Sequence, residues 1–150
     1  MPEQPTIPKQ APAPERPNSA PSTVLGFDYG TIKIGIAIGQ SITGTANPLQ
    51  IIKAKDGIPN WQTIEQLTQE WQPDAFVVGL PINMDGSESE MSIRARKFAN
   101  RLNGRFHRPA FLMDERLSSF EAAQQAGPAA KSPIDSLAAA LIVESWYASF

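Results

Sequence analysis

The sequence contains no cysteine and only one histidine, His107, among its 150 residues. Without cysteine the chain cannot form a disulfide, a thiolate-bound zinc site or a cysteine nucleophile, and one histidine is too few for a multi-histidine metal site. The lack of cysteine also suits a reducing cytoplasm, which is the compartment we expect. Carboxylates are then the side chains left to hold a metal ion.

Long apolar runs and a strong net charge are also missing. No stretch of eighteen apolar residues is present, so we expect no membrane partner, and the N-terminus does not resemble a signal peptide. The net charge of −2 argues mildly against a nucleic-acid partner. However, seven basic residues and only two acids, Asp114 and Glu115, fall between Arg94 and Arg116. A local basic band of this kind can bind phosphates, so RNA remains a candidate partner.

Proline is concentrated at the start of the chain. Residues 1–22 hold seven of the fourteen prolines, mixed with Ala, Gln, Ser and Thr, and we predict a disordered tail there. Residues 23–150 are long enough for one domain with a hydrophobic core.

The hydrophobic pattern of this domain predicts an α/β fold with a five-stranded mixed sheet and helices on both faces. The first three strands are expected to be antiparallel, and Pro48 indicates a bulge or an exposed edge. Ser87 and Glu90 fit a capping box at the start of the second helix. The predicted strands are 24–29, 34–39, 43–54, 74–80 and 109–114, and the predicted helices are 60–71, 87–103, 117–125 and 132–147.

Three acids occupy positions that a folded sheet could bring together. Asp28 lies late in an apolar strand, Glu115 follows the last strand, and Asp135 lies in the first turn of the last helix. Converging carboxylates repel one another and are costly to desolvate, and a divalent cation such as Mg²⁺ or Mn²⁺ removes that penalty. Two such ions can activate water and stabilise the leaving oxygen of a phosphodiester. Each acid also has a simpler interpretation: Asp28 could shape a turn, Glu115 could pair with Arg116, and Asp135 could stabilise a helix N-terminus.

Five motifs occur in order between Val24 and Tyr147: FDYGTIKIGIAIG, ITGTANPL, VVGLPINMDGSESEMSIRARKFANRL, DERLSSFEA and IDSLAAALIVES. Together they resemble the YqgF-type family of Holliday-junction-resolvase-like proteins, also called pre-16S rRNA nucleases. The resemblance implies a ribonuclease H-like fold, a bacterial cytoplasmic protein and a metal-dependent endonuclease role in 5′-end maturation of pre-16S rRNA. It also implies that Asp28, Glu115 and Asp135 are the catalytic and metal-binding acids.

The same resemblance marks Gly79, Pro81, Asp85 and Gly86 as a substrate-side loop, although Asp85 by itself looks like a turn residue. A basic stripe on the helix after Ser87 is predicted to contact phosphates, since it carries one sign of charge with few acidic partners at helical spacing. Arg116, beside Glu115, is the candidate for contact with the scissile phosphate. The members of the stripe are Arg94, Lys97 and Arg101.

Other functions stay open on the sequence. A Holliday-junction DNA resolvase would need a two-fold dimer to cut branched DNA symmetrically, whereas a monomer or weak homodimer is what we expect. The stretch between Phe120 and Asp135 is shorter than we expect of the family and has one basic residue, Lys131. This motivates a further alternative, a non-catalytic rRNA-binding ribosome-biogenesis factor. An actin-like or Hsp70-like nucleotide binder shares the Asp-x-Gly-Thr opening, but those proteins need two such domains.

Overall fold

The computed structural model describes residues 17–114 and 134–150. The predicted helix 117–125 and most of the predicted tail lie outside these ranges. The strands are β1 (Thr23–Asp28), β2 (Lys33–Gln40), β3 (Thr45–Lys55), β4 (Ile58–Pro59), β5 (Ala75–Leu80) and β6 (Ala110–Asp114). The helices are α1 (Trp61–Trp71), α2 (Glu90–Phe106) and α4 (Ile134–Ala148).

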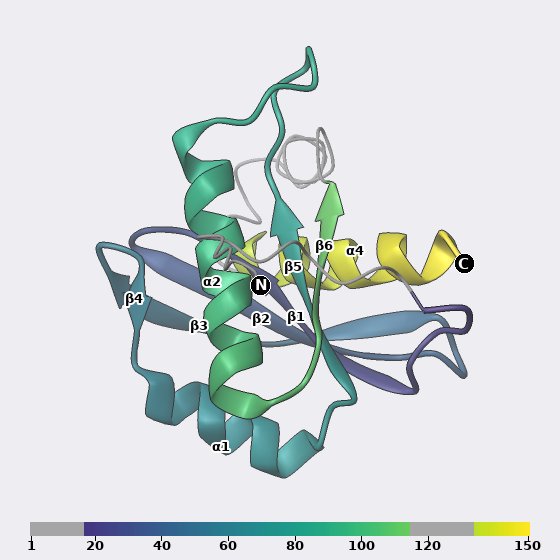
Figure 1. Cartoon of the computed structure of the whole chain (residues 1–150). Helices are drawn as coiled ribbons and strands as arrows, with labels where there is room; N and C mark the ends of the chain where they lie inside the picture. Colours follow the sequence, from purple (N-terminus) through teal and green to yellow (C-terminus); the bar gives the residue numbers. More distant parts are fainter. Residues whose placement is uncertain (1–16, 115–133) are drawn as a thin grey trace, which may run out of the picture.

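The strands form one mixed sheet in the order β4-β3-β2-β1-β5-β6 (Figure 1). β1, β2 and β3 are antiparallel neighbours, while β5 and β6 run parallel to β1, as the sequence predicted. The register between β2 and β3 shifts so that Ile36 faces Gln50 and Ala37 faces Pro48, which confirms the predicted bulge.

The sheet has six strands, not the five that the sequence predicted. The additional strand is β4, whose two residues pair with Ala54 and Lys55 at the end of β3. Asp56 and Gly57, with positive φ angles of 51° and 80°, form the turn that reverses the chain between β3 and β4. Two residues are too few to leave a hydrophobic period in the sequence, so β4 could not be recognised from its pattern.

Helices cover both faces of the sheet, as predicted (Figure 1). On one face, α1 and α2 pack on a core that includes Leu25, Phe27, Phe76 and Phe98. On the other face, α4 packs on a second core around Val24, Val77, Phe111 and Val143. No helix in the described part of the chain is both long and apolar enough to cross a membrane.

The start of α2 differs from the prediction. The capping box is made by Ser89 and Ser92, not by Ser87 and Glu90. The Ser87 backbone N–H instead donates to the Asp85 carboxylate at 2.9 Å, which closes a turn within the preceding loop and delays the helix. At its other end α2 continues to Phe106, three residues beyond the predicted end, and His107 caps it in the left-handed conformation with φ 59°.

Candidate nucleic-acid site at the carboxyl edge of the sheet

Asp28 is the last residue of β1 and is half-buried. Alternate residues of a strand point to opposite faces of the sheet. Leu25 and Phe27 belong to the core under α2, and Tyr29 packs against that core, whereas Val24 belongs to the core under α4. The alternation therefore assigns Asp28 to the face of the sheet that α4 covers.

The helix α4 lies directly on this face of β1 and β2. A Cβ atom built on Gly26 would collide with the Val143 side chain and would lie 3.3 Å from the carbonyl oxygen of Ala139. A Cβ on Gly39, which pairs with Val24, would collide with Val143 and lie 3.2 Å from the Tyr147 ring. Advancing along β1 toward Asp28 therefore means moving back along α4 toward its first turn, where Asp135 is located.

The parallel strands β1, β5 and β6 end at the same edge of the sheet. Phe27 is in register with Val78, and Leu80, two residues further on, is in register with Asp114 at the end of β6. Asp28 and Asp114 therefore lie at one carboxyl edge. Glu115 and Arg116, which follow Asp114 in the sequence, lie outside the described residues.

The structure thus describes only part of the predicted acidic trio. It places Asp28 with its side chain and Asp135 by its position in α4, and Glu115 is not described. Among the side chains that the structure describes, which exclude those of Glu115 and Asp135, no three aspartates, glutamates or histidines lie close enough together to hold a metal ion. The role of the trio stays a prediction.

Asp28 lines an open hollow of about 330 Å³, which we call the Asp28 hollow. The turn between β1 and β2 supplies most of its lining, and Met91 contributes from the first turns of α2. The turn is tight, because a Cβ on Gly30 would lie 2.6 Å from the carbonyl oxygen of Lys33. The hollow thus combines one carboxylate, Asp28, with one ammonium group, Lys33, at a solvent-accessible edge.

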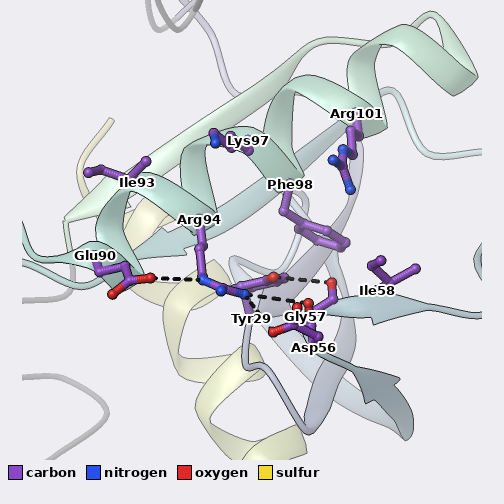
Figure 2. Close-up of a pocket in the computed structure, with 10 residues that line it drawn as sticks. All are labelled: Tyr29, Asp56, Gly57, Ile58, Glu90, Ile93, Arg94, Lys97, Phe98 and Arg101. Carbon is purple, nitrogen blue, oxygen red and sulfur yellow. Dashed lines mark hydrogen bonds and ion pairs between the residues drawn. The ribbon is translucent and has the colours of Figure 1, made fainter.

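A second hollow of about 320 Å³ adjoins the first, and we call it the α2 pocket. Tyr29 lines both hollows. The α2 pocket lies between α2 and the turn that joins β3 to β4 (Figure 2). Its lining includes Tyr29, Gly57, Ile58, Phe98, Lys97 and Arg101.

The basic stripe predicted on α2 lines this pocket, but its three cations differ in their partners. The Arg94 guanidinium lies 3.2 Å from the Asp56 carboxylate and 3.6 Å from that of Glu90, and the negative charge of Asp56 raises the pKa of Arg94. Within the part of the chain that the structure describes, neither Lys97 nor Arg101 has an acidic partner. Among the described residues, the positive charge of the stripe that no acid compensates is therefore at Lys97 and Arg101.

The loop between β5 and α2 projects beyond the carboxyl edge of the sheet (Figure 1). Its tip is a turn in which Gly86 has a φ of 90° and the Ser87 hydroxyl donates to Asp85 at 2.6 Å. Asp85 is therefore the turn residue that the sequence indicated. At the base of the loop, Gly79 belongs to β5, and the carbonyl of Pro81 accepts a hydrogen bond from the Ser92 hydroxyl.

Of the residues that line the α2 pocket, sequence reasoning predicted only the basic stripe, and it missed Tyr29, Asp56 and Gly57 among others. The Tyr29 hydroxyl donates to the Gly57 carbonyl at 3.1 Å, and the tyrosine ring packs against Phe98 with centroids 4.9 Å apart. An Asp-Gly pair is a turn signal, so Asp56-Gly57 could have indicated the β3–β4 turn. The contact between Gly57 and Tyr29 joins residues 28 positions apart, so no local sequence pattern could have predicted it.

This sheet order, with helices on both faces and an acid at the end of the first strand, defines an α/β ribonuclease H-like fold. Solved structures share it. The RuvC protein of Thermus thermophilus, solved in complex with a Holliday junction substrate, superposes with a TM-score of 0.52 at 14% identity, over 85% of this chain and 95% of RuvC. The fowlpox virus Holliday junction resolvase gives a TM-score of 0.51 at 13% identity, over 85% of this chain and 97% of the viral chain.

The chain belongs to the RuvX family, whose model, described as Holliday junction resolvase, matches residues 22–149. Bacterial relatives bear the name "Putative pre-16S rRNA nuclease". The Saccharophagus degradans protein is 56% identical over 131 residues, which cover 83% of this chain and 92% of the relative. The Azotobacter vinelandii protein is 55% identical over 136 residues, which cover 87% of this chain and 96% of the relative.

Proposed function

We propose that this protein is a metal-dependent nuclease that hydrolyses phosphodiester bonds in an RNA precursor of 16S ribosomal RNA. The relatives' shared name supports the substrate, and family membership over residues 22–149 supports the enzyme class. The observation that carries the proposal is the alignment of α4 along β1. The close contacts at Gly26 direct the first turn of α4, which contains position 135, toward the strand end that contains Asp28.

The proposed catalytic acids are Asp28, Glu115 and Asp135. Helical periodicity puts positions 135, 139 and 143 in one line, and Ala139 and Val143 are the residues that meet Gly26. On β1, Asp28 lies two residues beyond Gly26, on the same face of the sheet and toward the first turn of α4. Glu115 follows Asp114, whose strand ends at the same edge as β1.

The donor set fits a hard divalent cation. Three carboxylates supply oxygen ligands only, and Asp28 is half-buried in an open hollow that leaves room for water and substrate. Asp28, Glu115 and Asp135 would hold Mg²⁺ or Mn²⁺, which would supply an activated water and stabilise the charge of the phosphate. The protein itself would hold the three carboxylates at one edge of the sheet. Lys97 and Arg101 on α2 would orient the RNA strand, and Arg116 is proposed to contact the scissile phosphate.

Cleavage of a pre-16S rRNA fragment with Mg²⁺ or Mn²⁺ tests the proposal. Asp28→Asn should lower the rate on the order of a hundredfold or more, because loss of a ligand should cost at least as much as loss of its supporting contacts. Glu65→Gln, which changes an exposed acid on α1, is the matched control and should cut at the unmodified rate. Calorimetric titration with Mn²⁺ alone should show binding to the unmodified chain and weaker binding to Asp28→Asn.

Three results would argue against the proposal. If Asp28→Asn cuts as fast as the unmodified protein, the acids are not catalytic. If the unmodified protein cuts a four-way DNA junction and leaves the RNA intact, it is a junction resolvase, in line with the description of its family. RNA binding without any cleavage would indicate a ribosome-biogenesis factor that has no nuclease activity.

A further inference from the structure

The α2 pocket has a fixed aromatic floor. The Tyr29 ring is held by packing on Phe98 and by the hydrogen bond from its hydroxyl to the Gly57 carbonyl at 3.1 Å. Phe98 itself is only 3% exposed and packs on Phe27 and Trp61 with ring centroids 5.4 and 5.6 Å away. Because these rings are already ordered, a flat ligand that stacks on the exposed part of the floor would find a preformed surface.

Charge is distributed unevenly around the pocket. Arg94 is engaged by both Asp56 and Glu90, so the two carboxylates outnumber the one guanidinium and this side offers both donors and acceptors. Lys97 and Arg101, one helical turn apart on α2, carry positive charge without an acidic partner among residues 17–114 and 134–150. Figure 2 shows Arg101 pointing toward the side of the pocket where Phe98 and Ile58 lie.

An aromatic floor, a polar side with donors and acceptors, and a cationic rim together match the chemistry of one nucleotide. Its base is flat and has donors and acceptors at its edge, and its phosphate is an anion. A base that is paired in a helix cannot enter a pocket, because it stays stacked between its neighbours. An unpaired base can turn out of the strand and stack on an aromatic side chain.

We propose that the α2 pocket takes the base of one unpaired nucleotide beside the cleaved bond, and that Lys97 and Arg101 hold that nucleotide's phosphate. Tyr29 connects the two sites, because it follows Asp28 in the chain and lines both hollows. The proposal rests on the proposed nuclease function and adds to it a substrate class: RNA with an unpaired nucleotide next to the cut.

Binding of three RNAs tests the pocket: a duplex with a single unpaired nucleotide, the same duplex with an abasic residue at that position, and the perfectly paired duplex. Affinities are measured by fluorescence anisotropy with the full-length Asp28→Asn protein, so that the RNA is not cut. The bulged RNA should bind about tenfold more tightly than the perfect duplex, the scale expected for one stacked base. The abasic RNA should bind like the perfect duplex.

Variants connect this preference to the pocket. Ile58 lines the pocket and is 54% exposed, so Ile58→Trp should fold, fill the pocket and abolish the preference for the bulge. Ile42, which is 90% exposed, lies outside the lining of the pocket, so Ile42→Trp is the control and should keep the preference. Thermal melting checks that both variants are folded.

A charge variant supplies the second measurement. Lys97→Gln with Arg101→Gln should weaken binding of the bulged RNA more than binding of the perfect duplex. Arg105→Gln with Arg108→Gln removes the same charge outside the pocket lining and should weaken both RNAs by a similar factor. Equal binding of the three RNAs, a preference that survives Ile58→Trp, or no RNA binding at all would each overturn the proposal.

Cleavage assays with the unmodified chain separate this proposal from the proposed function. If the unmodified chain cuts none of the RNAs but the preference for the bulge holds, the nuclease function fails and the base-binding pocket stands. If it cuts RNA but binds the three RNAs alike, only the pocket proposal fails.

Discussion

Asp28 and Tyr29 are adjacent in the sequence, but their side chains are assigned to opposite faces of the sheet. The alternation of β1 assigns Asp28 to the face under α4, while Tyr29 packs against Phe98 of α2. Besides packing on Phe98, Tyr29 is held by Gly57, whose carbonyl accepts the hydrogen bond from the Tyr29 hydroxyl. A single glycine in the β3–β4 turn thus shapes the pocket next to the proposed catalytic edge.

Gly57→Ala should destabilise the protein for two reasons. The position has a φ of 80°, and a Cβ there would collide with the Tyr29 hydroxyl. Gly44→Ala is the matched control, because Gly44 has a similar φ of 67° and nothing lies within 4 Å of its Cβ position. We expect a loss of about 1–2 kcal/mol in the free energy of unfolding for Gly44→Ala, the usual cost of the left-handed conformation.

Gly57→Ala should cost roughly 1–3 kcal/mol more than Gly44→Ala, because the collision adds to the backbone strain. Urea unfolding of both variants measures the difference. Equal losses would show that Tyr29 moves aside freely and that the floor of the α2 pocket is not fixed.

At the scale of elements, the contact between α4 and β1 decides where the proposed catalytic acids lie. Because Gly26 has no side chain, α4 approaches β1 closely, and Val143 fills the space that a side chain at position 26 would occupy. Ala138, Ala139 and Ala140 are all buried at this surface. These three small residues of α4 therefore lie on or beside its contact with the sheet.

Gly26→Ala should push α4 away from the sheet. An added methyl group would meet Val143 and the Ala139 carbonyl, and overpacking of this kind costs about 1–3 kcal/mol. Cleavage should fall by more than the loss of folded protein explains, because the first turn of α4 moves with the helix. Unfolding and cleavage are measured on the same preparations.

The double variant Gly26→Ala with Val143→Ala tests the cause. Removing the Val143 methyl groups makes room for the new side chain, so the double change should cost less than the sum of the two single changes. Strictly additive losses would mean that the collision with Val143 is not what destabilises Gly26→Ala.

At the scale of the whole molecule, the segment before β1 is tied to the C-terminal helix. The Tyr147 hydroxyl donates to the Pro21 carbonyl at 3.0 Å, across 126 residues of sequence. Asp74, just before β5, accepts from the Thr23 backbone N–H at 3.1 Å. Burial first, and then the negative charge of Asp74, raise the pKa of Tyr147 to about 12.

Stability should fall as the pH rises from about 10 to about 12, because the folded protein keeps the Tyr147 proton in a range where the unfolded chain loses it. The raised pKa means that this contribution is fully present below pH 10. Tyr147→Phe should be less stable at neutral pH by about 1 kcal/mol through loss of the hydrogen bond. It should also show a shallower loss of stability across the alkaline range.

Urea unfolding at a series of pH values measures both effects. Tyr29→Phe, which alters the other tyrosine of the chain, is the control and should keep the alkaline loss of the unmodified protein. If Tyr147→Phe and the unmodified chain lose stability in parallel, Tyr147 is not the group responsible.

The sequence by itself determined the class of fold and most of its elements. Apolar runs of 74–80 and 109–114 and the helical period of 60–71 predicted β5, β6 and α1, because strands and helices leave local periods in the chain. Five motifs in order between Val24 and Tyr147 identified the family, which the comparisons confirmed. The roles of Asp28, Glu115 and Asp135 remain predictions.

Only the tertiary structure decided how distant segments meet. It brought the Asp56–Gly57 turn under Tyr29, paired Arg94 with Asp56 and left Lys97 and Arg101 without acidic partners among the described residues. It also set α4 against Gly26. These contacts depend on sheet order and close packing between residues far apart in the sequence, and local periodicity carries no information about either.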